Sequence, residues 1–256
     1  MTQRARPVIG VVGGMGPQAG LDLAQKVLAH TVAATDQDHV PTLLLSHPDR
    51  IVDRTEYLLG HIAENPAPAI LEVLLALDGL GATVAGMACN TAHAPVFFDA
   101  LQAGLRDAGA QVRLLHLVDE AARFVRTAYP AVRRVGVLST TGTQRLGLYP
   151  EALRRVGLEA VVPDAALQNR VHAAIYDPLQ GIKAQSHPVT PEAQATVMEA
   201  ARALQTQGAE ALLLGCTELP LALTGSALDG LPLIDPTRAL ARALLRETYP
   251  EKLRPW

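Results

Sequence analysis

The chain has 256 residues, of which 49% are apolar, 18% charged and 4% aromatic, and its formal net charge is −3. This composition excludes disordered, collagen-like and fibrous proteins, and the lack of a basic excess argues against nucleic acid as a partner. No apolar run reaches the ~18 residues of a membrane span, and the first residues lack the pattern of a cleaved signal peptide. We therefore expect a soluble, cytoplasmic protein with no membrane partner.

Short apolar runs alternate with longer amphipathic segments along the whole chain. This alternation predicts an α/β fold with parallel sheets. Several predicted helices have proline near their start and glycine just past their end, as is typical of helix boundaries. The expected strands are 8–12, 42–46, 83–87, 114–117, 134–138, 158–162, 211–214 and 231–234. The expected helices include 18–31, 68–80, 191–207 and 236–248.

The sequence contains an internal duplication. Residues 8–16 resemble residues 134–142 at an offset of 126, and residues 88–91 resemble residues 215–218 at an offset of 127. Two pairs of segments that agree on one period indicate two similar α/β lobes. We expect one lobe to comprise 1–112 plus 235–256, with the last helix returning to it, and the other to comprise 113–234.

Each predicted lobe carries one cysteine just beyond a buried-type strand, Cys89 in the first and Cys216 in the second. Ligands of open parallel sheets bind at the carboxyl ends of strands, so both thiols are expected at a ligand-facing edge. Polar residues suited to helix N-caps follow each cysteine, and N-terminal N–H groups lower the pKa of a nearby thiol. They are Asn90 and Thr91 after the first cysteine, and Thr217 and Glu218 after the second. Packing is the alternative role for each cysteine alone, but the symmetric pair favours function.

Two thiols on opposite sides of a small molecule suit racemisation, because one removes a proton from carbon and the other returns one. A redox pair is the competing thiol chemistry, but the sequence has no CxxC. A carbanion next to a carboxylate needs fixed donors. Ser139–Thr143, Asn90, Thr91 and Thr217 offer such donors at the same sheet edge, although hydroxyl groups at strand ends are equally common as helix caps.

A charged segment follows the second predicted strand. Arg54 or Arg50 in it suits a bidentate clamp on a substrate carboxylate. The alternative is a surface arginine paired with Asp53 or Glu56. Spacing alone leaves both interpretations open.

Three other motifs point to chemistries that we consider weaker. Residues 14–19 fit a dinucleotide-binding pattern, but Asp36 precedes the second strand instead of following it, and Pro17 suits a small-ligand loop equally well. His93, four residues after Cys89, suits a Cys/His hydrolase, which would leave Cys216 unexplained. No metal-binding spacing occurs, so we expect no metal.

Together these motifs resemble the aspartate/glutamate racemase superfamily, and most closely its aspartate racemases that work without pyridoxal phosphate. The matching segments are 13–17, 53–55, 89–93, 140–143 and 215–218. The resemblance implies two pseudo-symmetric flavodoxin-like lobes with the active site in the cleft between them. It also implies a homodimer without a cofactor, in which Cys89 and Cys216 transfer the protons.

By the same resemblance Arg54 holds the side-chain carboxylate of an acidic amino-acid substrate, and Asn90, Thr91, the 140–143 loop and the backbone around Ala92 hold the α-carboxylate. One position departs from the pattern, since Gln180 stands where these racemases commonly carry lysine, and Lys183 follows three residues later. The expected substrate is L- or D-aspartate, with glutamate or a broader set left open. The expected substrate-binding residues are Arg54, Asn90, Thr91, Ala92, Thr141, Thr143, Thr217, Met15 and Gln180.

Two alternatives to racemisation remain at this point. Within the superfamily, the protein would be a decarboxylase or cis–trans isomerase of a related diacid, although such enzymes usually rely on a single cysteine. Outside it, the protein would be a non-catalytic two-lobed binding protein for a small acid.

Overall fold

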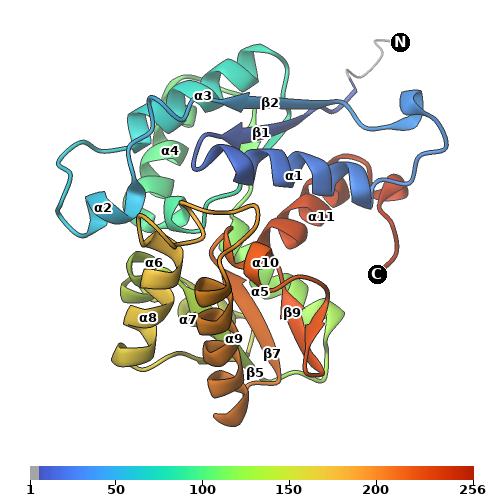
Figure 1. The fold of residues 1–256 in the computed structure, drawn as a ribbon. Helices are drawn as coiled ribbons and strands as arrows, with labels where there is room; N and C mark the ends of the chain where they lie inside the picture. The colour runs from blue at the N-terminus through green and yellow to red at the C-terminus, as the bar shows by residue number, and fades with distance from the viewer. Residues whose placement is uncertain (1–5) are drawn as a thin grey trace. The chain divides into compact units, whose positions relative to one another are not determined.

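A computed structural model describes residues 6–256. The chain folds into two compact units, Met1–Leu117 with Thr237–Trp256, and Val118–Pro236 (Figure 1). The chain first passes from one unit to the other after Leu117 and not at the expected position near 112, because Arg113 and Leu114 still pair with a strand of the first unit. Among residues 6–256 we find no helix whose length and apolar character would suit a membrane span.

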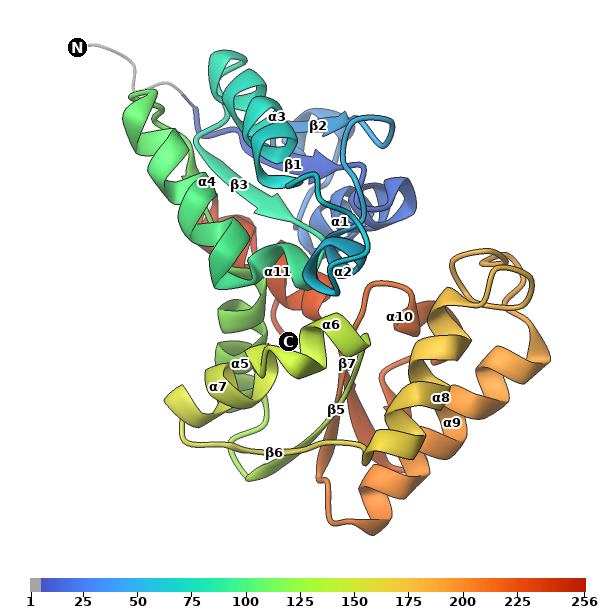
Figure 2. The same ribbon diagram turned by 90° about the vertical axis from the view of Figure 1, so that its left-hand side faces the viewer.

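The first unit is built on a parallel sheet with strand order β2-β1-β3-β4. Figures 1 and 2 show α3 and α4 side by side over one face of this sheet and α1 over the other. The strands are β1 (Ile9–Gly13), β2 (Thr42–Ser46), β3 (Val84–Met87) and β4 (Arg113–Leu114). The helices are α1 (Pro17–His30), α2 (Arg54–Leu58), α3 (Ala67–Gly79), α4 (Pro95–Asp107) and α11 (Pro236–Thr248), with 3-10 turns η1 (Asp36–Asp38), η2 (Thr91–His93) and η3 (Pro250–Lys252).

The second unit has strand order β6-β5-β7-β9-β8, and only β8 runs antiparallel to its neighbour. Its buried core lies between β5, β7, β9 and the paired helices α8 and α9. The strands are β5 (Arg134–Ser139), β6 (Glu159–Val161), β7 (Ala211–Gly215), β8 (Ala227–Leu228) and β9 (Leu231–Ile234). The helices are α5 (Leu117–Ala128), α6 (Thr141–Arg145), α7 (Leu148–Arg155), α8 (Ala165–Tyr176), α9 (Pro191–Thr206) and α10 (Leu219–Ala222).

The duplication read from the sequence extends to packing. In both units the first strand of the sheet lies between the second and third, and the cysteine follows the third. Gly10 of β1 and Gly136 of β5 stand at the same place, where a Cβ atom would crowd the neighbouring side chains. Those neighbours lie 127 residues apart, namely Leu77, Ala82 and Ala85 around Gly10, and Leu204, Ala209 and Leu212 around Gly136.

The helices before the third strands also end alike. Gly81 and Gly208 have φ of 92° and 93°, a left-handed conformation that favours glycine. The next residue in each case donates its N–H to a carbonyl five residues back, the bond of a Schellman motif. Glycine is therefore required at both turns, and the turns direct β3 and β7 into their sheets in the same way.

The expected α/β fold with parallel sheets is confirmed, and most predicted elements match within one residue at either end. The strand expected at 114–117 is wrong in extent. Only Arg113 and Leu114 pair with β3, and Leu117 already begins the amphipathic helix α5. Leu115 is buried without belonging to a strand or helix, and a short apolar run does not by itself distinguish these states.

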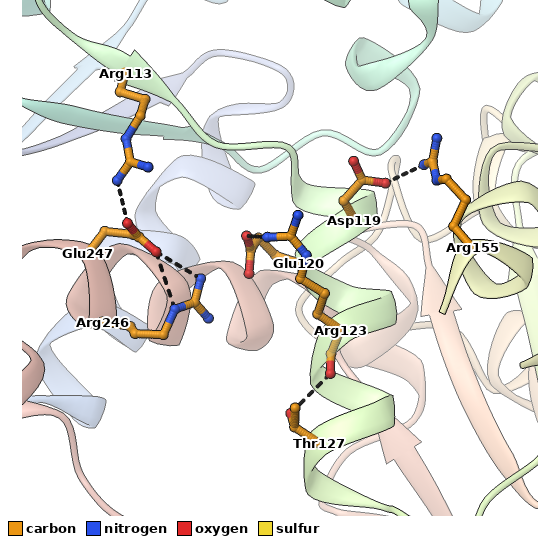
Figure 3. A network of polar contacts seen from close by, with 8 residues as sticks. All are labelled: Arg113, Asp119, Glu120, Arg123, Thr127, Arg155, Arg246 and Glu247. Atoms are coloured by element: carbon orange, nitrogen blue, oxygen red, sulfur yellow. Dashed lines mark hydrogen bonds and ion pairs between the residues drawn. The ribbon is translucent and has the colours of Figure 1, made fainter. Parts of the chain in front are cut away.

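Ion pairs within each unit account for several charged side chains (Figure 3). In the first unit Glu247 of α11 pairs with Arg113 of β4 and with Arg246. In the second unit Asp119 of α5 pairs with Arg155 of α7, and the buried Glu120 pairs with Arg123. These groups bind one another within their own units, so we assign them structural roles.

Candidate active site

Both cysteines lie at the carboxyl edge of their own sheet. Cys89 follows β3 after one intervening residue, and Cys216 follows β7 directly. Both thiols are free, and each residue is only 6% exposed. The equivalent strand ends therefore present two reduced sulfur atoms, one per unit.

Arg54 reaches the same edge of the first unit. It begins α2, because the Asp53 carboxylate accepts the N–H groups of Thr55 and Glu56 at 2.7 and 3.0 Å and caps the helix. The Arg54 residue is 6% exposed, and its guanidinium donates to the carbonyl oxygens of Val52 and Met15 at 3.0 and 3.1 Å. These bonds join the β1–α1 loop to the segment before α2.

The alternative clamp, Arg50, lies on the surface. Its side chain is 62% exposed and approaches Glu72 at 3.7 Å. Arg50 is thus a surface arginine, although its acidic neighbour is Glu72 and not Asp53 or Glu56, whereas Arg54 is a buried cation at the sheet edge. Both arginines were candidates from spacing, and burial separates them.

The residues after Cys89 are all buried: Asn90, Thr91 and Ala92 are 4%, 7% and 0% exposed. Asn90 stands at the N-cap of η2, but its side chain makes no capping hydrogen bond. The expected side-chain cap is therefore wrong. The backbone of Asn90 is itself helical, which is not the extended conformation of a capping residue.

His93 is bound to the backbone of Cys89. Its Nδ1 lies 2.8 Å from the Cys89 carbonyl oxygen. Burial, together with the neighbouring His116, lowers the pKa of His93 to about 3. A neutral ring whose Nδ1 bonds a carbonyl is poorly suited to take a proton from the thiol, so the hydrolase interpretation loses its base.

Cys216 is held by a carboxylate. Its Sγ donates to Oε2 of Glu218 at 2.9 Å, and the hydroxyl of Thr217 donates to the same oxygen at 3.0 Å. Burial and the Glu218 charge raise the pKa of the Cys216 thiol well above its usual value, while Lys183 opposes them. The expected lowering of this thiol pKa is wrong, because the helix that follows is a single turn and a carboxylate lies beside the sulfur.

Glu218 was considered in the sequence only as a capping residue. The structure brings its carboxylate into hydrogen-bond contact with the thiol, a contact that sequence reasoning missed. A carboxylate two residues after a strand-end cysteine is the signal that was present.

The hydroxyl-rich loop after β5 caps α6. The Thr140 side chain accepts the N–H of Thr143 at 3.4 Å and donates to the Thr143 hydroxyl at 3.2 Å. Thr141 is half-buried, and its N–H points to Nδ1 of His172 at 3.4 Å. The capping interpretation therefore holds for Thr140, while Thr141 and Thr143 lie at the same edge as Cys216.

Gln180 and Lys183 lie on a tight turn after α8. The exposed Gln180 lines a cleft of about 200 Å³ with Arg170, Asp177 and Glu192. Lys183 stacks its Nζ over the Tyr176 ring, 4.4 Å from the centroid, and is near enough to act on the Cys216 charge. The structure therefore brings the Lys183 charge within electrostatic reach of the Cys216 thiol.

Other binding chemistries find little support in the described residues. Asp36 lies in η1, before β2, so it does not stand where a ribose-binding acid would. Residues 6–256 contain no group of three or more His, Cys, Asp or Glu side chains placed to hold a metal ion.

The fold and these strand-end residues define a two-unit α/β protein with one cysteine at each sheet edge. The family model described as Asp/Glu/Hydantoin racemase matches residues 12–244. The structure of Picrophilus torridus aspartate racemase is 30% identical, with a TM-score of 0.75 and coverage of 94% of this chain and 94% of that chain. The glutamate racemase of Koribacter versatilis is 28% identical over 95% of this chain and 75% of its own length.

A more distant similarity supports the same fold. The structure of glutamate racemase from Francisella tularensis in complex with D-glutamate has a TM-score of 0.66 at 16% identity, and the match covers 98% of this chain and 84% of that chain. This chain belongs to the Asp/Glu/hydantoin racemase family, and the resemblance stated from its motifs is confirmed. It is accordingly an isomerase of the racemase type.

Proposed function

We propose that this protein interconverts L- and D-aspartate without a cofactor, using Cys89 and Cys216 for proton transfer at the α-carbon. The observation that carries the proposal is the pair of free, buried thiols at equivalent strand ends of duplicated units. The similarity to an aspartate racemase over nearly the whole chain supports aspartate as the substrate. Glutamate and related acidic amino acids are the next substrates to test.

In the proposed reaction one sulfur acts on each face of the substrate α-carbon. A thiolate takes the α-proton, the C–H electron pair is left on the carbon and the adjacent carboxylate, and the opposite thiol delivers its own proton to the other face. The two cysteines have then exchanged protonation states. Reaction of the other enantiomer uses the same steps in reverse.

Glu218 would allow Cys216 to act both as the acid and as the base. In the resting structure Cys216 is a thiol that donates to the Glu218 carboxylate, so it is ready to give a proton to carbon. When Cys216 must act as the base, Glu218 accepts the thiol proton. The Thr217 hydroxyl, which donates to the same oxygen, keeps that carboxylate in place.

We propose two groups of contacts for the substrate carboxylates. Arg54, a buried cation fixed by two carbonyl groups, and Lys183, which takes the role first expected of Gln180, bind the distal carboxylate. Fixed donors near the thiols bind the α-carboxylate, whose negative charge grows in the transition state. The proposed contacts there are Asn90, Thr91, Ala92, Thr141, Thr143 and Thr217, with Met15 shaping the loop beside Arg54.

The resemblance further supports a homodimer that acts in the cytoplasm. Sedimentation of the purified protein tests the first part of this proposal. A monomer at the concentrations used for activity would contradict it.

The test of the proposed function is chiral analysis of L-aspartate and D-aspartate after incubation with the protein. Cys89→Ser and Cys216→Ser should each lower racemisation by about 10³-fold, since a serine hydroxyl is a far weaker acid than a thiol. Unchanged thermal midpoints in both variants serve as the folding control. Loss of carbon dioxide from a diacid, isomerisation of a double bond, or binding without turnover would replace the proposal by one of the alternatives.

A further inference from the structure

His93, four residues after Cys89, contacts the backbone carbonyl of that cysteine and not its thiol. His93 is 1% exposed, and its Nδ1 lies 2.8 Å from the carbonyl oxygen of Cys89. A carbonyl oxygen only accepts hydrogen bonds, so Nδ1 carries the proton and Nε2 of the neutral ring carries a lone pair. Among the described residues, Nε2 has no partner with hydrogen-bond geometry, although the backbone of Leu115 lies nearby.

The ring is enclosed by aromatic neighbours. Phe98 stacks on it at a centroid distance of 5.5 Å, and His116 meets it edge-on at 4.9 Å. Nε2 of His116 lies 3.2 Å from the His93 carbonyl oxygen, so it donates there. This packing keeps the imidazole in one orientation, with Nδ1 directed at Cys89.

The other half of the duplication bonds the same carbonyl by different means. The Cys216 carbonyl accepts the backbone N–H of Leu219 at 3.1 Å. At the position equivalent to His93 stands Pro220, which has no side-chain donor. Both units thus hold the carbonyl of the thiol-bearing residue, one through the backbone and the other through an imidazole.

We propose that His93 is a positioning residue for Cys89, which by donating from Nδ1 to the Cys89 carbonyl fixes the peptide that carries the thiol. This inference rests on the proposed function, because it assumes that the Cys89 sulfur must be aimed at an α-carbon. Small displacements of a reacting group reduce rates strongly, up to about 10²-fold for 1 Å. The ring does not itself exchange a proton with the substrate.

Two substitutions separate positioning from packing. His93→Asn places an amide donor close to the position of Nδ1 but loses the ring that packs on Phe98. His93→Phe keeps the ring volume but removes the donor. A positioning role therefore predicts that His93→Asn is the more active variant, whereas a packing role predicts that His93→Phe is.

We expect His93→Phe to lower kcat by about 10-fold to 100-fold with KM changed less than about twofold, and His93→Asn to stay within about threefold of the parent kcat. The thermal midpoint should be lower for Asn than for Phe, so activity and stability change in opposite directions. If Phe keeps its kcat while Asn loses it, or if both lose activity in proportion to stability, the proposal is overturned.

A measurement on the unmodified protein does not depend on turnover. Two-bond proton–nitrogen correlation spectra of the resting protein report which ring nitrogen of His93 is protonated, and His93→Phe identifies the resonance. The Nδ1–H tautomer, unchanged between pH 6 and 8, is the expected result. An Nε2–H tautomer, which would direct the proton to Leu115, overturns the positioning role of His93 even if racemisation is confirmed. If racemisation is not found, the spectrum still reports the tautomer, so the two failures are distinguishable.

Discussion

Cys89 and Cys216 occupy equivalent positions in the duplicated units, but their neighbours differ in charge. Beside Cys89 lies a histidine with a pKa of about 3, which is neutral at physiological pH. Beside Cys216 lies the Glu218 carboxylate, which accepts the thiol proton in a hydrogen bond. The two halves therefore share a backbone frame and differ in how each thiol is controlled.

The first prediction concerns Glu218. In Glu218→Gln the loss of the carboxylate charge should lower the pKa of Cys216, and each unit of that decrease raises its thiolate fraction about tenfold. Alkylation of Cys216 by iodoacetamide should therefore become faster, while racemisation should fall by about 10²-fold, because without the carboxylate Cys216 no longer rests as the protonated thiol that delivers a proton to carbon. Peptide mapping by mass spectrometry distinguishes the two cysteines.

The matched control for that experiment is Glu192→Gln, which removes an exposed carboxylate of the same unit. It should leave both the Cys216 alkylation rate and racemisation close to those of the parent. Slower alkylation of Cys216 in Glu218→Gln would contradict the assigned role of Glu218.

A second prediction uses the pH dependence of stability. The folded pKa of His93 is about 3 and its unfolded value is about 6.5, so the unfolded chain binds this proton first as the pH falls. The stability associated with the neutral ring is fully present above pH 6.5 and is lost at about 1.4 kcal/mol per pH unit down to pH 3.

His93→Phe should remove this contribution. Below pH 6.5 the free energy of unfolding should then change by about 1.4 kcal/mol less per pH unit than in the parent. Urea unfolding at pH 7, 6 and 5 measures the slope for both proteins, and the difference between them isolates His93. Parallel curves for the parent and His93→Phe would show that the ring is not buried in its neutral form.

At the scale of elements, the turn after α8 determines where Lys183 lies. A Cβ on Gly181 would come within 2.6 Å of the backbone N and O of Asp177. The Asp177 side chain also accepts the N–H groups of Leu179 and Gln180 at 2.9 and 2.8 Å, which tightens the turn. The chain therefore reverses within a few residues and directs Lys183 towards Tyr176.

The third prediction tests this turn. Gly181→Ala should lower the free energy of unfolding by about 1–3 kcal/mol, because the clash involves backbone atoms. It should also raise KM for aspartate, since Lys183 moves. Gly79→Ala is the control: its Cβ meets no atom within 4 Å, and alanine at this helical position should raise stability by about 0.4–1 kcal/mol. Equal changes in the free energy of unfolding for Gly181→Ala and Gly79→Ala, measured by urea unfolding, would contradict the proposed clash at Gly181.

The same turn shows where sequence reasoning ends. Strand periodicity and the proline and glycine signals located β2, β9 and α11 to the residue, because those signals act locally. The resemblance gave Gln180 as a binding residue by its distance from Tyr176 along the chain, and this stays a prediction. The path of the turn depends on contacts of Asp177 that spacing does not contain. Likewise, the thiol pKa of Cys216 depends on the rotamer of Glu218, which places a carboxylate against the sulfur.

At the scale of the whole molecule, duplication is the central feature. In both sheets the first strand lies between the second and third, and a cysteine follows the third. Crowded glycines recur at an offset of 126 and the Schellman turns at an offset of 127. The sequence repeat predicted this correspondence because the repeated residues are those that pack the sheet edge. The proposed mechanism needs an acid and a base that exchange roles, and the duplication supports it because it places one cysteine at each of two equivalent strand ends.

The most direct test of the two-thiol account follows the isotope at early times. The protein is incubated with L-aspartate in deuterated water, and each enantiomer is then separated and examined by mass spectrometry before equilibrium is approached. Two thiols acting from opposite sides predict that the D-aspartate formed carries deuterium at the α-carbon while the remaining L-aspartate is still unlabelled. D-aspartate that retains the original hydrogen, or L-aspartate labelled as fast as product forms, would show that one group both removes and returns the proton and would contradict the account.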